Sequence, residues 1–310
     1  MLGANAVEVR LRGVLERGDP SAPWRSLAQL LEGGQRIRPR LVLAMIDAAG
    51  APATDTAVDD AAALELVHLS TLVHDDIIDR GTSRRGAPTL NAAHGDAVAL
   101  LVGNIIRDHA LTICSPPARA VLNRASLAVN LGQLWETQAR GRSCSYDELF
   151  HIQAHKTAHA FRACAELASL HRPQPVPEGA RVGAELAALA FQAVDDWLDH
   201  LPTAAYTRKA GAGDAANGVP TFLAAAGFDG RACGTAAGIA VEVVQRQHVA
   251  GPLAHLPLPA LTHEVLTFVS ALRERADALA ADSDVRPVLA ECFARIARRC
   301  AEAHATMVAS

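Results

Sequence analysis

The chain has 310 residues, with 29 Lys and Arg against 33 Asp and Glu, which gives a net charge of −4. This charge supplies no basic field, so neither nucleic acid nor an anionic membrane is expected as a bulk partner. Half of the residues are hydrophobic, only 4% are aromatic, and 64 are alanine, the strongest helix former. The composition therefore predicts an all-α protein.

Segments with helical spacing of apolar residues alternate with short loops rich in Pro and Gly. In chain order, the predicted helices span residues 55–79, 118–140, 146–170, 179–200 and, as two helices, 261–308. Many of them are apolar over most of their surface, which is typical of helices buried in a bundle. No linker divides the chain, so we predict a single domain over residues 1–310, a bundle of roughly ten or more helices.

The six cysteines form no CxxC pair, and charged residues interrupt the N-terminal segment where a signal peptide would be apolar. No stretch reaches the roughly 20 apolar residues of a membrane span. We therefore expect a reduced, cytoplasmic protein with no integral membrane segment.

Two acidic clusters of the form DDxxD carry the strongest chemical signal. They comprise Asp75, Asp76 and Asp79, and Asp195, Asp196 and Asp199. Positions i and i+4 of a helix share a face, so the outer carboxylates repel one another at the negative end of the helix dipole. This placement becomes favourable if Mg²⁺ ions lie between the carboxylates and bind a phosphate. The alternative is two solvated helix ends, although two chance matches are expected on the order of a few times in a thousand.

Basic residues follow a double glycine and both acidic clusters. They are Arg36 and Arg38, Arg84 and Arg85, the mid-helix Lys156, and Arg208 and Lys209. Arginine binds phosphate oxygens bidentately, and lysine adds a point charge. Each pair alone is more typical of a surface, but their alternation with acidic clusters predicts a diphosphate site.

Six segments resemble, in order, the motifs of the trans-isoprenyl diphosphate synthases, also called polyprenyl synthetases. They are GGQRIRP (33–39), ELVH (65–68), LVHDDIIDR (72–80), RRGAPTLN (84–91), KTA (156–158) and FQAVDDWLD (191–199). The resemblance implies an isoprenoid synthase bundle around a central cavity, and a homodimer. It also implies that an allylic prenyl diphosphate is ionised there with up to three Mg²⁺ ions, and that isopentenyl diphosphate then attacks the cation.

The resemblance implies a role for each matching residue. The Mg²⁺ ligands would be Asp75, Asp79 and Asp195, with Asp76 and Asp199 holding metal-bound water. The allylic diphosphate would be bound by Arg84, Lys156, Gln192 and Lys209, and that of isopentenyl diphosphate by Arg38, His68 and Arg85. Thr157 and Gln192 would stabilise the cation through their oxygen dipoles. The catalytic residues would be Asp75, Asp79, Asp195, Lys156 and Arg84.

Two positions depart from the family pattern. Gln35 and Val219 stand where the family usually has lysine, so each removes a positive charge from a diphosphate pocket. A charge-assisted contact contributes roughly 1.5–3 kcal/mol, so we expect binding to weaken roughly 10- to 100-fold. The loss leaves open a slower or more selective synthase, an enzyme with an unusual acceptor, or a terpene-cyclase-like enzyme. A separate alternative is the partner subunit of a two-component synthase. Because Arg38, His68 and Arg85 are retained, condensation is favoured.

In this family, an aromatic side chain four or five positions before the first aspartate cluster limits the length of the product. Here those positions are Thr71 and Ser70, which are both small. We therefore predict a linear all-trans prenyl diphosphate of C20 or longer.

Overall fold

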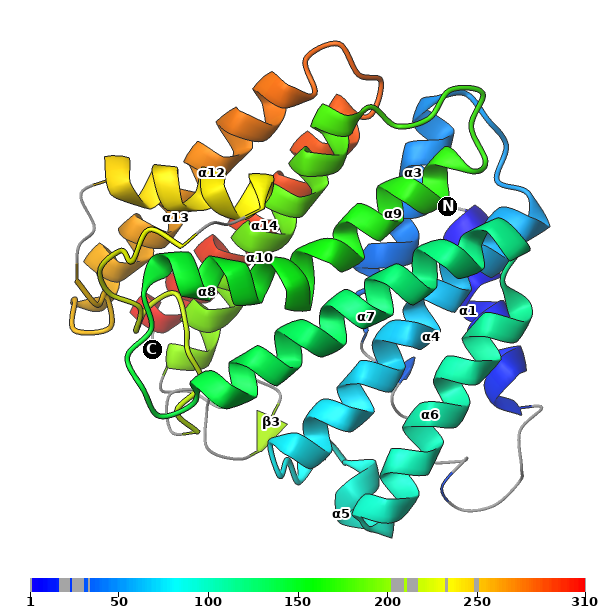
Figure 1. Ribbon diagram of the computed structural model, residues 1–310, viewed down its shortest axis with the longest axis horizontal. Coiled ribbons are helices and arrows are strands. Elements are labelled where there is room, and N and C mark those ends of the chain that lie inside the picture. The colour runs from blue at the N-terminus through cyan, green and yellow to red at the C-terminus, as the bar shows by residue number, and fades with distance from the viewer. Residues whose placement is uncertain are drawn as a thin grey trace. The chain divides into compact units, whose positions relative to one another are not determined.

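The computed structural model describes residues 2–16, 23, 31–32, 34–201, 209–210, 217–231, 234–247 and 251–309. Nearly all of their regular structure is helical (Figure 1), which confirms the all-α prediction. The helices group into two compact units, which we describe one at a time. The first comprises residues 1–126, 163–175 and 207–211, and the second 127–162, 176–206 and 212–310. That the chain forms one domain stays a prediction.

The first unit is built around the long helix α4 (Asp55–Ile78). Its other helices are α1 (Leu2–Glu16), α3 (Ile37–Ala48), α5 (Leu90–His94) and α6 (Asp96–Ile113), all of which pack against α4. Thr54 begins α4 by accepting a hydrogen bond from the backbone N–H of Ala57 at 3.2 Å. Most residues between Ala57 and Ser70 are buried, because α4 is apolar on nearly every face. The helix therefore holds the first aspartate cluster, at its C-terminal end, on a rigid support.

A small antiparallel sheet follows α4, in a part of the chain for which no strand was predicted. Its strands are β1 (Ser83–Arg84), β2 (Ala87–Pro88) and β3 (Lys209–Ala210), in the order β2-β1-β3. The residues between β1 and β2, Arg85 and Gly86, have φ values of 55° and 82°. Two successive positive φ angles match the tight turn that fits the twist of a hairpin. The register places Lys209 opposite Arg84, so two basic positions far apart in sequence lie side by side.

The second unit is built around α10 (Glu178–His200). The helices α8 (Tyr146–Gln153), α12 (Thr235–Arg246), α13 (Leu258–Leu279) and α14 (Arg286–Ala309) pack against α10. Close approach depends on small residues: a Cβ on Gly183 would lie 2.9 Å from Cδ1 of Leu289. The core of this unit also holds stacked rings, with the centroids of Phe222 and Phe268 4.6 Å apart.

The helix predicted over 146–170 is divided by a π-helix. After α8, π-helix η1 (Ala154–Ala158) precedes α9 (His159–Ser169). Helix α7 (Pro116–Ala139) packs against η1 at Gly132, where a Cβ would lie 2.7 Å from Cα of Lys156. One turn of π-helix inside an α-helix shifts the side chains that follow it and is frequent at functional sites. Here it carries Lys156 and Thr157.

Burial explains the chemistry of the described cysteines, none of which forms a disulfide. Burial raises the pKa of Cys144 and Cys300 to about 12 and that of Cys292 to about 11, so these thiols stay protonated. Cys233 lies outside the described residues. Among the helices that the structure describes, none combines the length and apolar character needed to cross a membrane.

Candidate active site

The first aspartate cluster closes the C-terminal end of α4. The N–H of Gly81 donates to the carbonyl of Asp76 at 2.8 Å, and Arg80 adopts a φ of 52°, which ends the helix in a left-handed turn. Asp75 and Asp79 are half-buried, one helical turn apart. Two carboxylates at this end of a helix raise the local negative potential, so they favour a bound cation.

Asp76, between them, is buried and already has a cationic partner. Nε of Arg84 donates to its two carboxylate oxygens at 3.0 and 2.9 Å, and Nη2 donates to Oδ1 at 2.8 Å. Burial lowers the pKa of Arg84, but the hydrogen bonds to Asp76 and the charges of Asp75, Asp76 and Asp79 raise it overall. Arg84 therefore lies within the field of all three aspartates. The side-chain amide of Asn91 stabilises the turn after α4 by donating to the backbone carbonyls of Asp76 and Gly81 at 3.3 and 3.1 Å.

A cationic cluster surrounds His68, two turns before the aspartates on α4. Burial lowers the pKa of His68 well below its ordinary value, and the charges of Arg38, Arg84, Arg85 and Arg36 lower it further. His68 is therefore a neutral imidazole at neutral pH, because burial, and after it the charges of four guanidinium groups, disfavours a further positive charge. Such a cluster is suited to an anion.

Glu65, one turn earlier on α4, is the buried carboxylate of this cluster. Burial raises its pKa, although the charges of Arg38, Arg36 and Arg85 act in the opposite direction. Arg36 reaches it through Nη1 at 3.6 Å and also forms an ion pair with Glu8 of α1 at 3.1 Å. Burial lowers the pKa of Arg38, whereas the negative charge of Glu65 acts to raise it. Glu65 and Glu8 offset only part of the charge of Arg36, Arg38 and Arg85, so this group keeps excess positive charge.

The glycine loop before α3 lies close to these guanidinium groups. A Cβ on Gly34 would lie 3.0 Å from Nη1 of Arg85 and would overlap Nη1 of Arg36. Gln35 is exposed beside them, and Gly33 lies outside the described residues. A side chain at position 34 would therefore require the end of the Arg36 side chain to shift.

The second aspartate cluster lies in the last two turns of α10, in the second unit. Asp196 is buried and accepts hydrogen bonds from Nε2 of Gln192 at 2.8 Å, Nε2 of Gln153 at 3.2 Å and the backbone N–H of Phe222 at 2.7 Å. Asp195 has 40% of its side chain exposed, and Asp199 is half-buried. Asp196 therefore anchors the helix end, while its two neighbours remain accessible.

Lys156 and Thr157 project from π-helix η1 toward different partners. Nζ of Lys156 lies 2.6 Å from Oε1 of Glu136, a buried residue of α7. The hydroxyl of Thr157 donates to Oε1 of Gln192 at 3.2 Å. The structure thus joins Thr157, Gln192 and Asp196 in one chain of hydrogen bonds. Glu136 and Gln153 were not predicted as site residues, because they lie 20 and 43 positions from their partners and belong to none of the motifs recognised.

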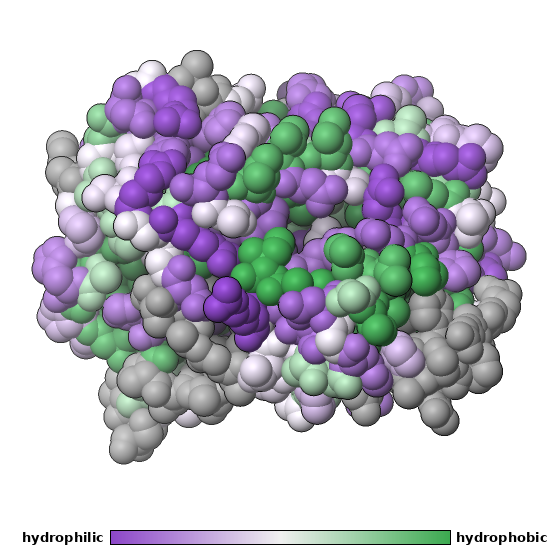
Figure 2. All heavy atoms as spheres, turned by 60° about the horizontal axis from the view of Figure 1, so that its bottom comes forward, coloured by the Kyte–Doolittle hydropathy of each residue, from purple (hydrophilic) through white to green (hydrophobic). Residues whose placement is uncertain are grey.

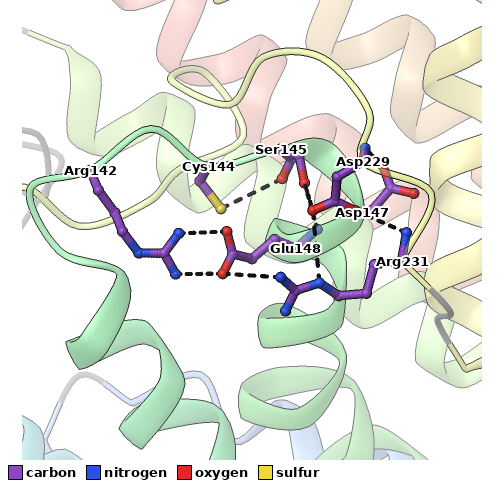
Figure 3. A network of polar contacts seen from close by, with 7 residues as sticks. All are labelled: Arg142, Cys144, Ser145, Asp147, Glu148, Asp229 and Arg231. Carbon is purple, nitrogen blue, oxygen red and sulfur yellow. Dashed lines mark hydrogen bonds and ion pairs between the residues drawn. The ribbon is translucent and has the colours of Figure 1, made fainter.

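The loop that contains Val219 is tied to α8 by a polar network (Figure 3). Ser145 donates to Asp229 at 2.9 Å, and the N–H of Asp229 donates to Asp147 at 3.1 Å. Arg142 pairs with Glu148 and holds the pKa of that carboxyl below its usual range. In the same loop, the backbone N–H of Phe222 donates a hydrogen bond to Asp196. The loop is therefore held both to α8 and to the second aspartate cluster.

Comparison with known proteins identifies the family. The family model described as polyprenyl synthetase matches residues 24–240, which is more than half of the chain. The chain belongs to the polyprenyl synthetase family.

Two curated relatives illustrate the range of the similarity. The (2E,6E)-farnesyl diphosphate synthase of Mycobacterium bovis is 37% identical over 175 residues, which is 53% of this chain and 48% of that protein. The chain thus spans about half the length of the first curated relatives that it matches. The geranylgeranyl diphosphate synthase of Cereibacter sphaeroides is 31% identical over 252 residues, covering 73% of this chain and 83% of the relative.

Solved structures of similar proteins have the same fold as this chain. A decaprenyl diphosphate synthase from Rhodobacter capsulatus has a TM-score of 0.71 at 22% identity and covers 96% of both chains. A heptaprenyl diphosphate synthase from Staphylococcus aureus has a TM-score of 0.72 at 20% identity, over 96% of this chain and 97% of that one. At this identity the similarity concerns the fold alone.

The two departures from the family pattern have different surroundings. Gln35 is exposed, whereas the side chain of Val219 is only 9% exposed. Gly218, just before it, has a φ of 65° and accepts a hydrogen bond from the N–H of Gly141 at 2.9 Å. A charged side chain is therefore easier to restore at position 35 than at position 219.

The aspartate clusters suit a hard cation that keeps part of its water shell. In the part of the chain that the structure describes, no three His, Cys, Asp or Glu side chains converge on one point. Mg²⁺ does not require such a cage, since it takes one or two carboxylates, several waters and the phosphates of a substrate. The half-buried oxygens of Asp75 and Asp79 match this donor set.

Proposed function

We propose that the chain is a Mg²⁺-dependent trans-prenyltransferase that joins isopentenyl diphosphate to an allylic prenyl diphosphate. The observation that carries the proposal is the cluster on α4. Burial and the charges of four arginines keep the pKa of His68 low, two turns before the aspartates at the end of α4. Polyanion binding and metal binding therefore meet on one helix, as a diphosphate substrate requires.

In the proposed reaction, Asp75 and Asp79 of the first cluster, and Asp195 of the second, are the direct Mg²⁺ ligands, for up to three ions. Asp76 and Asp199 hold water of the metal shell. Asp76 has both oxygens on Arg84, which favours this indirect role. Bound Mg²⁺ neutralises the charge that develops on the leaving diphosphate.

The allylic diphosphate is the proposed ligand of Arg84, Lys156, Gln192 and Lys209. Arg84 has an exposed fraction of only 11%, so its charge is weakly screened. Glu136 orients the ammonium of Lys156 through their 2.6 Å contact. The oxygens of Thr157 and Gln192, held together at 3.2 Å, present dipoles that stabilise an allylic cation.

Isopentenyl diphosphate is the proposed ligand of Arg38, His68 and Arg85. The neutral imidazole of His68 can donate one hydrogen bond to a phosphate oxygen. Gln35 lies in the exposed loop beside these residues and offers an amide where the family usually has an ammonium. The result is an acceptor site with one charge fewer, which favours a slower or more selective synthase.

The decisive experiment incubates the pure protein with Mg²⁺, isopentenyl diphosphate and each C5 to C20 allylic diphosphate, followed by mass analysis. A longer prenyl diphosphate is expected. A hydrocarbon or alcohol formed from one prenyl diphosphate would instead establish a terpene-cyclase-like enzyme. Activity that appears only with a second protein would identify a partner subunit of a two-component synthase. Asp75→Asn is the negative control.

Product length is the next part of the proposal. Ser70 is buried on α4, and Thr71 is half-buried with its hydroxyl donating to the carbonyl of His68 at 2.8 Å. Neither fills the space of an aromatic ring, so we propose a linear all-trans product of C20 or longer. Ser70→Phe and Thr71→Phe should each shorten the product while leaving the first condensation largely intact. A wild-type protein that stops at C10 or C15 would contradict this.

We also propose a homodimer, formed through the exposed apolar side chains of α6. Leu100, Leu101 and Ile105 are 50%, 61% and 43% exposed. Figure 2 shows that hydrophobic side chains gather on one face of the molecule among hydrophilic ones. Exposed apolar side chains grouped on one helix are suited to association with a second copy of the chain. Light scattering should report a dimer, and Leu101→Glu should produce monomers. The cytoplasmic location, like the single domain, stays a prediction.

A further inference from the structure

Arg299 lies beside the second aspartate cluster, although no motif in the sequence pointed to it. It belongs to α14, and its Nη2 forms an ion pair with Oδ1 of Asp195 at 3.0 Å. Its guanidinium carbon lies 5.4 Å from the centroid of the Phe191 ring. Phe191 and Asp195 are one turn apart on the same face of α10, so the side chain of Arg299 contacts the ring of one and the carboxylate of the other.

This ion pair differs from the contacts of the neighbouring Asp196. Asp196 is buried and holds three neutral donors, which fix it in place. Asp195 is 40% exposed, and the side chain of Arg299 is 31% exposed, so water and ions reach the pair. An ion pair of this kind contributes little to stability and exchanges readily for another partner of the carboxylate.

The other terminal nitrogen of Arg299 adds an independent observation. Nη1 is buried, yet it has no hydrogen-bond acceptor among the residues that the structure describes. A buried N–H without an acceptor is unfavourable, and such a group calls for a further ligand. Of the two terminal nitrogens of Arg299, Nη2 therefore pairs with Asp195, and Nη1 has no acceptor among the described residues.

We propose that Arg299 is a positioning residue that neutralises Asp195 until a metal ion takes its place. The inference rests on the proposed function, in which Asp195 is a Mg²⁺ ligand. A guanidinium and a metal ion compete for the same carboxylate oxygen, so Arg299 weakens the binding of metal alone. Once displaced, the fork can bind diphosphate oxygens bidentately. Arg299 thereby couples metal binding at Asp195 to the arrival of the diphosphate.

Binding of Mn²⁺ alone, followed by the electron paramagnetic resonance signal of the free ion, tests the inference without turnover. Arg299→Gln is expected to bind Mn²⁺ about two- to fivefold more tightly than the wild type, because it removes a partly exposed ion pair. Arg299→Lys keeps the charge and should bind as the wild type does. The matched control is Arg298→Gln, which removes the same charge from the adjacent exposed position, where Arg298 pairs with Glu291 at 3.0 Å.

A double variant separates this inference from the proposed function. Asp195→Asn should lose affinity for Mn²⁺, and adding Arg299→Gln to it should have no further effect. If Arg299→Gln changes Mn²⁺ affinity no more than Arg298→Gln does, the inference is overturned while the metal site stands. If Asp195→Asn binds Mn²⁺ like the wild type, the metal role of Asp195 fails and the inference fails with it.

Melting curves recorded without metal show whether each variant is folded. Should Arg299→Gln not fold, Phe191→Leu provides a second route, because it removes the ring beneath the guanidinium and keeps every charge. This variant should also tighten Mn²⁺ binding, since it loosens the hold of Arg299 on Asp195. Unchanged binding in a folded Phe191→Leu would then count against the inference.

Discussion

The two aspartate clusters have the same DDxxD pattern but different electrostatic surroundings. In both, the second aspartate is buried and the outer ones are more accessible. Asp76 is neutralised by the charged fork of Arg84, whereas Asp196 is held by two side-chain amides and a backbone N–H. At the second cluster the cation is instead Arg299, and it pairs with the first aspartate, Asp195.

The difference shows that one motif can be completed in two ways. A buried carboxylate needs either a cation or several donors, because desolvation otherwise disfavours its charge. At α4 the cation is buried with the carboxylate, so the pair is fixed. At α10 the amides fix the helix end, and the partly exposed cation is left to exchange with other ligands.

The largest expected effect is the loss of an outer aspartate from either cluster. Asp75→Ala and Asp195→Ala should each lower turnover by about 10³-fold, because each removes a proposed metal ligand. The fold should survive, since each change also relieves repulsion between like charges. Steady-state rates and circular dichroism measure the two effects, with Asp55→Ala, at the other end of α4, as control. Near-normal activity in either variant would show that the metal assignment is wrong.

Removing a partner of the buried aspartate should destabilise the fold more at the first cluster than at the second. Arg84→Ala leaves Asp76 buried without its cation and should lower the free energy of unfolding by about 3–5 kcal/mol. Gln153→Ala removes one of three donors to Asp196 and should cost only about 1.5–3 kcal/mol. Urea unfolding compares them. Equal losses would mean that Asp76 does not depend on Arg84 for its charge.

Restoring the two lysines that the family usually has should affect substrate binding differently at positions 35 and 219. Gln35→Lys adds an ammonium in the exposed loop beside Arg36 and should lower the KM for isopentenyl diphosphate about tenfold. Val219→Lys starts from a buried position, so we expect a lower free energy of unfolding to accompany any gain for the allylic partner. Initial rates over a range of both substrates supply the constants. A higher KM in Gln35→Lys would indicate a pocket reshaped for another acceptor.

The smallest expected effect is on the pH dependence of stability in the unit that holds the first cluster. The folded pKa of His68 is depressed, so the unfolded chain binds more protons below about pH 6.5 and stability falls there. Glu65, whose folded pKa is raised, acts in the opposite direction. When the pH is lowered from 7 to 5.5, the free energy of unfolding should fall in the wild type. In His68→Gln this fall should be smaller by about 1 kcal/mol. Identical pH profiles would contradict a His68 that stays neutral in the folded protein.

Much of the site could be anticipated from local pattern. Alanine content and apolar spacing predicted the helices that became α4, α7 and α10 within a few residues at each end, and two helices over residues 261–308 where α13 and α14 lie. The two DDxxD clusters and the loops between them were visible as motifs, because metal and phosphate chemistry uses residue types at short, fixed spacings. The same local reasoning missed the sheet β2-β1-β3 and the π-helix η1, since two-residue strands and a single wide turn leave no periodic signal.

Partner choice was decided only by the tertiary structure. The sequence by itself determined that the chain is helical, that it carries two acidic clusters, and which family it resembles. It did not indicate that Arg84 neutralises Asp76, that the N–H of Phe222, 26 residues away, holds Asp196, or that Arg299 from the last helix pairs with Asp195. The physical reason is that a buried charge is satisfied by whichever donors packing brings within about 3 Å, and packing joins segments regardless of their separation along the chain.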